Sequence, residues 1–275
     1  MANPLRRPLR RPLGTLESMG RQARFHREAV LQIPFAIRNY PGEIRRLLGE
    51  VSLGSGALAA IGGTIVIISF LTIAIGFEIG LQGYSQLSTV GVAALSGFTS
   101  AYINTREGAP LIAAIALIAT VGGGFTAQLG AMRVSEEVDA LETMAVRPVA
   151  YLVSTRIVAG LIAVIPLYTL ALIMTYASTK FVTTTINGQP DGTYDHYFQV
   201  FLAPSDILIS MVKLTVMAVA IILIHSYYGY NASGGPVGVG VAVGRAVRTS
   251  LIVVMVIDLL LTVSLYGHSV IEISG

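Results

Sequence analysis

The stretch LAAIGGTIVIISFLTIAIGF, residues 58–77, places twenty consecutive positions without a charged side chain in one run. A helix needs about 20 predominantly apolar residues to cross the hydrocarbon core of a bilayer, so this stretch is long enough to span a membrane. The whole chain fits this interpretation, because 53% of its 275 residues are hydrophobic and its mean hydropathy is +0.71. The sequence predicts an all-α integral membrane protein with five transmembrane helices, over about 57–82, 109–131, 155–180, 206–226 and 248–268.

The basic residues predict how these helices are oriented. Ten of the eighteen Lys and Arg residues lie in the first 50 positions, and basic clusters beside spans stay in the cytoplasm. The segment 88–103 is apolar but short and rich in Gly, Ser and Thr. If it does not cross the membrane, 15 Lys and Arg residues lie inside and 2 outside, with Lys213 within the membrane. If it does cross, 12 lie inside and 5 outside. We therefore expect five spans with the N-terminus inside and the C-terminus outside, an external loop at 184–205, and cytoplasmic segments at 132–148 and 226–248.

The residues before the first span divide into two segments. Residues 1–21 are a basic leader that Pro interrupts too often for a helix, so we expect it to be flexible. Residues 22–52 are predicted to form interfacial amphipathic helices, and a soluble N-terminal hairpin is the alternative. Apolar side chains at helical spacing face one way and polar ones the other: Ile44, Leu47, Leu48 and Val51 against Arg45, Arg46 and Glu50. The basic face is expected to point outward to lipid phosphates, and residues 53–275 to form one transmembrane domain.

A short acidic segment, MRVSEEVDALETMAVRP (132–148), lies between the second and third spans. Ser135 is a suitable N-cap, acids in the following turn suit the helix dipole, and Pro148 should end the helix after about three turns. An apolar stripe is expected on one side: Val134, Val138, Leu141 and Ala145. Cytoplasmic connectors are usually basic, so acids here indicate a partner with basic residues. A solvated connector resting on the bilayer is the alternative.

Two charged residues fall inside predicted spans, where burying a charge is costly. Lys213 and Asp258 lie at similar depth below the external ends of their helices, roughly 12–15 Å at 1.5 Å per residue, so they can pair if the helices are neighbours. Glu107, at the start of the second span, could join them, and Arg106 is assigned to the same polar cluster. Removing one partner should then be more harmful than removing both.

Several other functions are excluded by what the sequence lacks. There is no cysteine, and no Lys follows a Gly, so thiol chemistry and a Walker A phosphate loop are absent. The glycine-rich stretch 234–244 has no GxGxxG pattern and is expected to be a flexible cytoplasmic turn. His225 has no HExxH context, so no metal or cofactor site is expected, and no enzyme activity. A nucleic-acid partner is not expected, because a membrane-surface role suits the basic residues better.

The chain resembles the MlaE/YrbE permease family of bacterial lipid transporters. The likeness is carried by TREGAPLIAAIALIATVGGGFTAQLGAMRVSEEVDALETMAVRPVAYLVSTRIVAG (105–160) and spans about 45–268. The family pattern starts R-E-x-x-P and continues with E-x-x-x-A-L-x-x-M-x-x-x-P; Gly108 and Arg147 depart from it. A second block, HSYYGYNASGGPVGVGVAVGRAVRTS (225–250), is similar to YrbE permeases of actinobacterial, including mycobacterial, Mce systems, nearest the B-type paralogue.

The resemblance implies a multi-pass permease of the bacterial inner (plasma) membrane that moves lipid through a dimer interface. The implied partners are a second YrbE paralogue in a heterodimer, a cytoplasmic ABC ATPase that holds ATP and Mg, and Mce-domain proteins on the periplasmic side. The acidic segment corresponds to the coupling helix that docks on the ATPase, through Ser135, Glu136, Glu137, Asp139, Leu141, Glu142 and Met144. Candidates for lining the lipid pathway are Glu78, Leu87 and Val90. The implied direction of transport is import, and export is one alternative. A second alternative is a subunit that transports nothing and anchors Mce proteins in the membrane.

Overall fold

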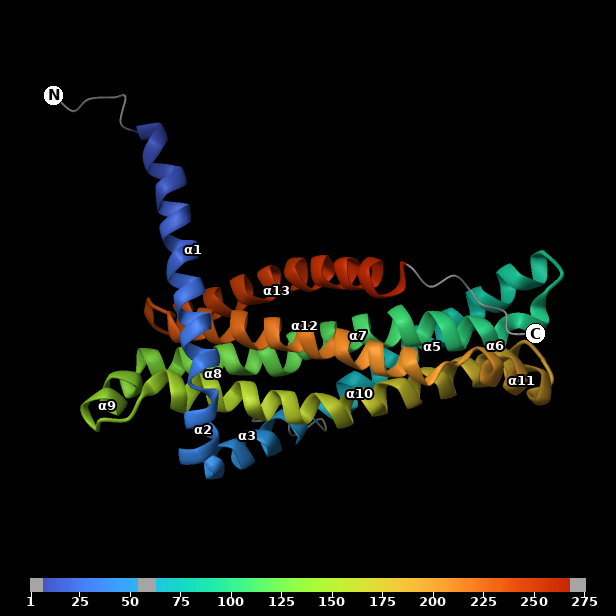
Figure 1. Ribbon diagram of the computed structural model, residues 1–275, viewed down its shortest axis with the longest axis horizontal. Coiled ribbons are helices and arrows are strands. Elements are labelled where there is room, and N and C mark those ends of the chain that lie inside the picture. Colours follow the sequence, from blue (N-terminus) through green and yellow to red (C-terminus); the bar gives the residue numbers. More distant parts are fainter. Residues whose placement is uncertain (1–6, 54–62, 268–275) are drawn as a thin grey trace.

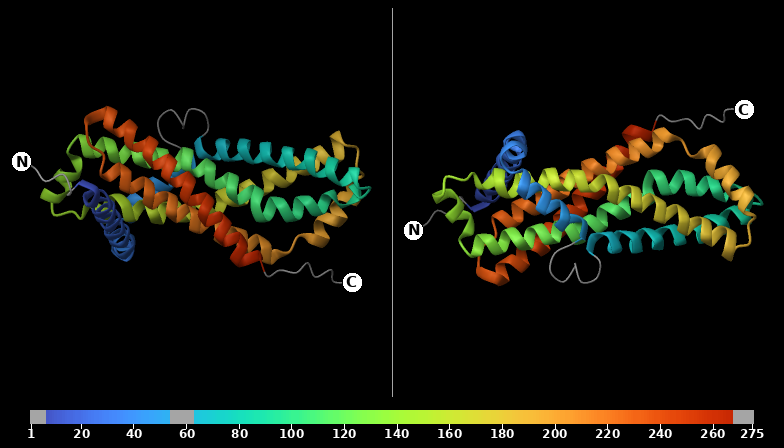
Figure 2. Two further views of the ribbon diagram at one scale, coloured as in Figure 1. Left: turned by 90° about the horizontal axis from the view of Figure 1, so that it is seen from above. Right: turned by 90° about the horizontal axis from the view of Figure 1, so that it is seen from below.

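The structure is a computed structural model that describes residues 7–53 and 63–267. Within them, five helical segments are long and apolar enough to cross a membrane, as predicted. They are α5 (Gly63–Thr89), a second span Ala93–Val134, a third span Val149–Ile186, α12 (Pro204–Tyr230) and α13 (Gly235–Tyr266). Figures 1 and 2 show these helices running along one common long axis. The predicted span positions 57–62 and 268 lie outside the described residues.

The second span is longer than predicted, because most of segment 88–103 continues it. The span consists of η2 (Ala93–Leu95), α6 (Ser96–Thr99), a π-helical stretch η3 (Ser100–Gly108), α7 (Ala109–Leu117), a second π-helical stretch η4 (Ile118–Gly122) and α8 (Gly123–Val134). The prediction that segment 88–103 forms no span of its own is confirmed. Just after this segment, the buried Asn104 side-chain amide donates to the Thr179 hydroxyl of the third span at 2.9 Å.

The third span packs closely against α5 through small residues. It consists of η5 (Val149–Ser154), α10 (Thr155–Phe181) and η6 (Val182–Ile186). A Cβ at Gly76 would come within 2.4 Å of the Thr175 carbonyl oxygen, so only glycine permits this approach. The Thr179 hydroxyl then donates to the carbonyl of Gly76 at 2.8 Å. Small residues and interhelical hydrogen bonds are what hold helices together in lipid, where apolar burial supplies little driving force.

The two ends of the bundle carry different elements. Figure 1 places α9 (Glu137–Thr143) and the N-terminal helices toward one end, and α6 and α11 (Asp191–Phe201) at the other. The turn between α12 and α13 lies at the α9 end. The segments predicted to be cytoplasmic therefore share one end of the molecule, and the predicted external segment 184–205 lies at the opposite end.

The segment before the first span forms three helices: α1 (Arg7–Leu31), α2 (Ile33–Asn39) and α3 (Pro41–Leu53). The prediction of a flexible leader was wrong for the described residues 7–21, which are helical. Pro8 lies in the first turn of α1, where the backbone N–H would have no helical acceptor in any case. Figure 1 shows α1 crossing the bundle axis at a steep angle, and its Phe25 ring packs on Tyr227 at 5.5 Å between centroids.

The amphipathic pattern of α3 is correct on its apolar face only. Ile44 and Leu47 are buried in a cluster with Ala159 of α10, and Val51 is also buried. Arg46, predicted to face lipid phosphates, instead lies between two acids of its own helix, Glu43 and Glu50. The sequence interpretation overlooked that these acids are placed one turn away on either side of Arg46.

The glycine-rich stretch 234–244 is not a flexible turn. It forms the first turns of α13, so the predicted cytoplasmic segment 226–248 reduces to a connection of four residues, 231–234. Gly234 and Gly235 have φ of +91° and +70°, a conformation that favours glycine, and Pro236 then begins the helix. Only the first two glycines serve the turn; the later ones are helical.

Candidate functional site

The acidic segment forms a short helix that projects from the end of the bundle (Figure 1). This helix, α9, connects α8 to the start of the third span and contains seven residues. Its two flanking residues Glu136 and Ala145 have φ of 61° and 58°, a left-handed conformation that reverses the chain on each side. The predicted length of about three turns was therefore too long, since seven residues make about two turns.

Ser135 does not cap α9, which corrects the predicted N-cap. Glu136 occupies the cap position, and no side chain caps the helix. The Ser135 hydroxyl lies 3.0 Å from the Ala131 carbonyl of the preceding helix and 2.8 Å from a carboxylate oxygen of Glu137. Pro148 does not end the helix either, because the chain leaves helical geometry at Met144.

The side chains of α9 divide into a solvent face and a buried anchor. Val138 is fully buried, and Leu141 packs partly against the core. The acids predicted to face a partner are all exposed: Glu136, Glu137, Asp139 and Glu142. Met144 is also exposed, at 64% of its surface, beside these four acids. Of the acids, Asp139 is already paired with Arg133 at the end of α8.

Inside the bundle, Lys213 of α12 is completely buried and holds a polar cluster together. Its ammonium group donates to a Glu107 carboxylate oxygen at 2.9 Å, to the Thr262 hydroxyl at 2.7 Å and to the Arg106 carbonyl at 2.9 Å. The Asp258 carboxylate of α13 lies 2.9 Å from the same nitrogen. The contact between Lys213 and Asp258 that equal depth predicted is therefore present, and Glu107 joins it.

The side chain of Arg106 belongs to a neighbouring ion pair, which corrects its predicted place in the Lys213 cluster. Its guanidinium contacts the carboxylate of Asp206 at 2.9 Å, at the start of α12. The same guanidinium lies 4.0 Å from the ring centroid of Tyr102 and 4.5 Å from that of Tyr266. Asp206 was not among the predicted site residues, although an acid in the first turn of a span is a suitable partner for a nearby arginine.

The three candidates for lining the lipid pathway differ in their surroundings. Leu87 lines a cleft of about 340 Å³ between α5 and the outer part of the second span. The cleft is also lined by Ile79, Gln82, Gly83, Gln86, Thr99 and Ile103. Val90 is 70% exposed outside this cleft, and exposed Glu78 accepts a hydrogen bond from Gln82. Of the three candidates, only Leu87 lines the cleft.

Residues 54–264, which contain every candidate residue described above, match the family model of the permease MlaE. The chain belongs to the MlaE permease family. The permease is 29% identical over 205 residues to the intermembrane phospholipid transport system permease protein MlaE of Haemophilus influenzae. That match covers 74% of the permease and 78% of the relative.

Other relatives come from different lineages. A probable ABC transporter permease protein of Rickettsia prowazekii is 29% identical over 209 residues, or 71% of the permease and 76% of the relative. The chloroplastic protein TRIGALACTOSYLDIACYLGLYCEROL 1 of Arabidopsis thaliana is 28% identical over 188 residues. The latter match covers 68% of the permease but only 54% of the Arabidopsis protein.

Proposed function

We propose that this permease is the membrane subunit of an ABC-type lipid transporter that carries lipid through a dimer interface. The observation that carries the proposal is α9, an exposed acidic helix at one end of five membrane-spanning segments in a chain of the MlaE family. ATP and Mg are held by a separate cytoplasmic ATPase in this proposal, since the chain has no phosphate-binding loop.

The exposure of α9 supports its role as the coupling helix. Glu136, Glu137 and Glu142 are free to meet basic side chains of a partner, and Met144 supplies an apolar contact beside them. Val138 fixes the helix to the bundle, so a force on the acids is transmitted to the second and third spans.

Lipid is the proposed cargo because the relatives' names include a phospholipid transport permease. Helices α5 and α13 are among those that leave apolar side chains uncovered. Phe70, Ile73 and Phe77 of α5 are exposed, as are Ile252, Leu259 and Val263 of α13. A second permease subunit and lipid would cover these faces. We further propose that the protein lies in the bacterial plasma membrane and that its second subunit is a YrbE paralogue. Its proposed external partners are Mce-domain proteins, and the proposed direction of transport is import.

The deciding experiment is reconstitution of the complex in liposomes with and without this subunit. ATP-dependent movement of a fluorescent phospholipid is expected only when the subunit is present. If a complex that lacks it moves lipid at the same rate, the chain is a structural subunit. Mass spectrometry of lipid that copurifies with the complex would identify the cargo.

Membrane topology gives a first prediction. The chain has no cysteine, so Ser135→Cys, Ser233→Cys and His196→Cys each introduce a single thiol at an exposed position. An impermeant maleimide added to intact spheroplasts should label only the His196→Cys protein, because charge distribution places the other two sites inside. Gly188 is a poorer external site, because its φ of +74° favours glycine. Labelling of Ser135→Cys in intact cells would refute the proposed orientation.

The outer cleft gives a second prediction. Leu87→Trp should fill the cleft beside Thr99 and Ile103 and slow lipid transport several-fold, while ATPase binding is unchanged. Val90→Trp is the matched control, because Val90 is on the same part of the chain but does not line the cleft. Equal transport rates in the two variants would exclude the cleft from the lipid pathway.

A further inference from the structure

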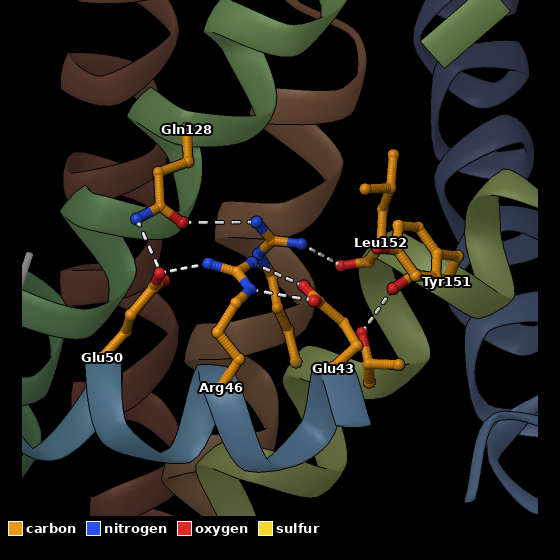
Figure 3. A network of polar contacts seen from close by, with 8 residues as sticks. Glu43, Arg46, Glu50, Gln128, Tyr151 and Leu152 are labelled. Atoms are coloured by element: carbon orange, nitrogen blue, oxygen red, sulfur yellow. Dashed lines mark hydrogen bonds and ion pairs between the residues drawn. The ribbon is translucent and has the colours of Figure 1, made fainter. Parts of the chain in front are cut away.

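A second buried charge lies away from the Lys213 cluster, near the α9 end of the bundle. Arg156 of α10 is 2% exposed, which is rare for an arginine. Its guanidinium donates to the backbone carbonyl of Leu152 at 2.5 Å and to the side-chain carbonyl of Gln128, on α8, at 3.2 Å (Figure 3). A buried guanidinium is tolerated only when nearby groups satisfy and balance it.

The balancing charge comes from the interfacial helix α3. Gln128 donates in turn to a Glu50 carboxylate oxygen at 3.4 Å, so its amide connects α10 to α3. Glu50 and Glu43 both contact Arg46, and the hydrogen bond that Arg46 donates to the Glu43 carboxylate raises the pKa of Arg46. The four ionised side chains, two Glu and two Arg, have no net charge together. Without Arg156, this cluster would contain two acids and one arginine.

Two of the three connected helices, α8 and α10, belong to the spans on either side of α9. Gln128 lies on α8, which leads directly into α9, and Arg156 lies in the span that follows it. The same span start also holds α1, because the Ser154 hydroxyl donates to the Ala29 carbonyl at 2.7 Å. Helices α1 and α3 are therefore both joined to the segment that would move first when a partner pulls on α9.

We infer that the contact chain Arg156–Gln128–Glu50 makes α3, α8 and α10 move as one unit, and so transmits displacement of α9 to the interfacial helix and the spans. These are positioning residues, and the inference rests on the proposed docking of an ATPase on α9. Separation of α3 from α8 would leave the buried Arg156 without its balancing acid, so the three helices stay together through the cycle.

The test uses two variants and a matched control in the reconstituted complex. Glu50→Gln removes the acid that balances Arg156, and Gln128→Leu removes the amide that joins Arg156 to Glu50. Glu17→Gln is the control, because Glu17 also pairs with an arginine one turn away, Arg21, but on the exposed surface of α1. The amount of lipid moved per ATP hydrolysed should fall roughly three- to tenfold in the two variants, because each loses one charge-assisted hydrogen bond. The same ratio should stay unchanged in the control.

A second measurement follows the motion directly. Spin labels on Gly49→Cys and Ala127→Cys, exposed neighbours of Glu50 and Gln128, should report the same distance with and without trapped ATP. A distance that changes with nucleotide would overturn the inference. The inference would also fail if the Glu50 and Gln128 variants lost thermal stability but still moved the same amount of lipid per ATP. If the unaltered complex moves no lipid at all, the proposed function fails instead.

Discussion

Replacing Lys213 by Met is expected to prevent accumulation of folded permease. The variant leaves two carboxylates, Glu107 and Asp258, in the bundle without the cation that both contact. Removing one partner of a buried ion pair destabilises a protein by about 3–5 kcal/mol, which is a large part of the stability of a typical domain. The yield and the thermal unfolding of the detergent-purified protein measure the effect.

The compensated variant must remove three charges. Lys213→Met/Asp258→Leu, the double change suggested by sequence alone, would still leave Glu107 without its cation. Lys213→Met/Glu107→Gln/Asp258→Leu should therefore restore most of the lost stability, because the Lys213 cluster then contains no unpaired charge.

The control for the Lys213 variants is another lysine that pairs with an acid near a span end. Lys180→Met breaks the ion pair with Asp195, in which the lysine side chain is 40% exposed. This variant should lose less than about 1 kcal/mol of folding stability. A fully stable Lys213→Met protein would show that the buried cluster contributes nothing to folding.

Reversing the charge of three acids on α9 should abolish docking of the ATPase. Glu136→Lys/Glu137→Lys/Glu142→Lys changes exposed side chains only, so the permease should fold while its affinity for the ATPase falls by at least about tenfold. Asp139 is a weaker choice than sequence alone suggested, because Arg133 already neutralises it. Copurification of the ATPase and lipid-stimulated ATP hydrolysis are the measurements.

Two comparisons make the α9 experiment specific. Asp191→Lys reverses an exposed acid at the opposite end of the molecule and should leave docking intact. Met144→Asp should weaken docking without loss of stability, whereas Leu141→Asp also disturbs the core, because Leu141 packs against it. Normal copurification of the triple variant would mean that α9 is only a connector between two spans.

The sequence by itself determined the number of spans and the main buried pair. Inside a bilayer the backbone must satisfy its own hydrogen bonds, so an apolar stretch of sufficient length has little choice but to be a helix. That constraint is local, and it explains why five spans were predicted correctly. The contact between Lys213 and Asp258 was also predictable, because each charge has a fixed depth along its helix and a high cost if unpaired.

Only the tertiary structure decided which side chains meet when several partners are available at one depth. The Arg106 side chain pairs with Asp206, and only its backbone carbonyl contacts Lys213. The Arg46 side chain contacts Glu43 and Glu50 of its own helix. Such choices depend on how each helix is rotated and which helix is its neighbour, and close packing at residues such as Gly76 fixes both.

The limits of several helices also depended on distant contacts. Residues 93–108 extend the second span because Asn104 and other polar side chains find acceptors on the third span. The glycine-rich stretch 234–244 is helical after its first two glycines, although isolated glycines favour turns. Hydropathy could locate the spans because it acts on each segment separately, whereas these contacts join residues far apart in the sequence and exist only once the helices pack.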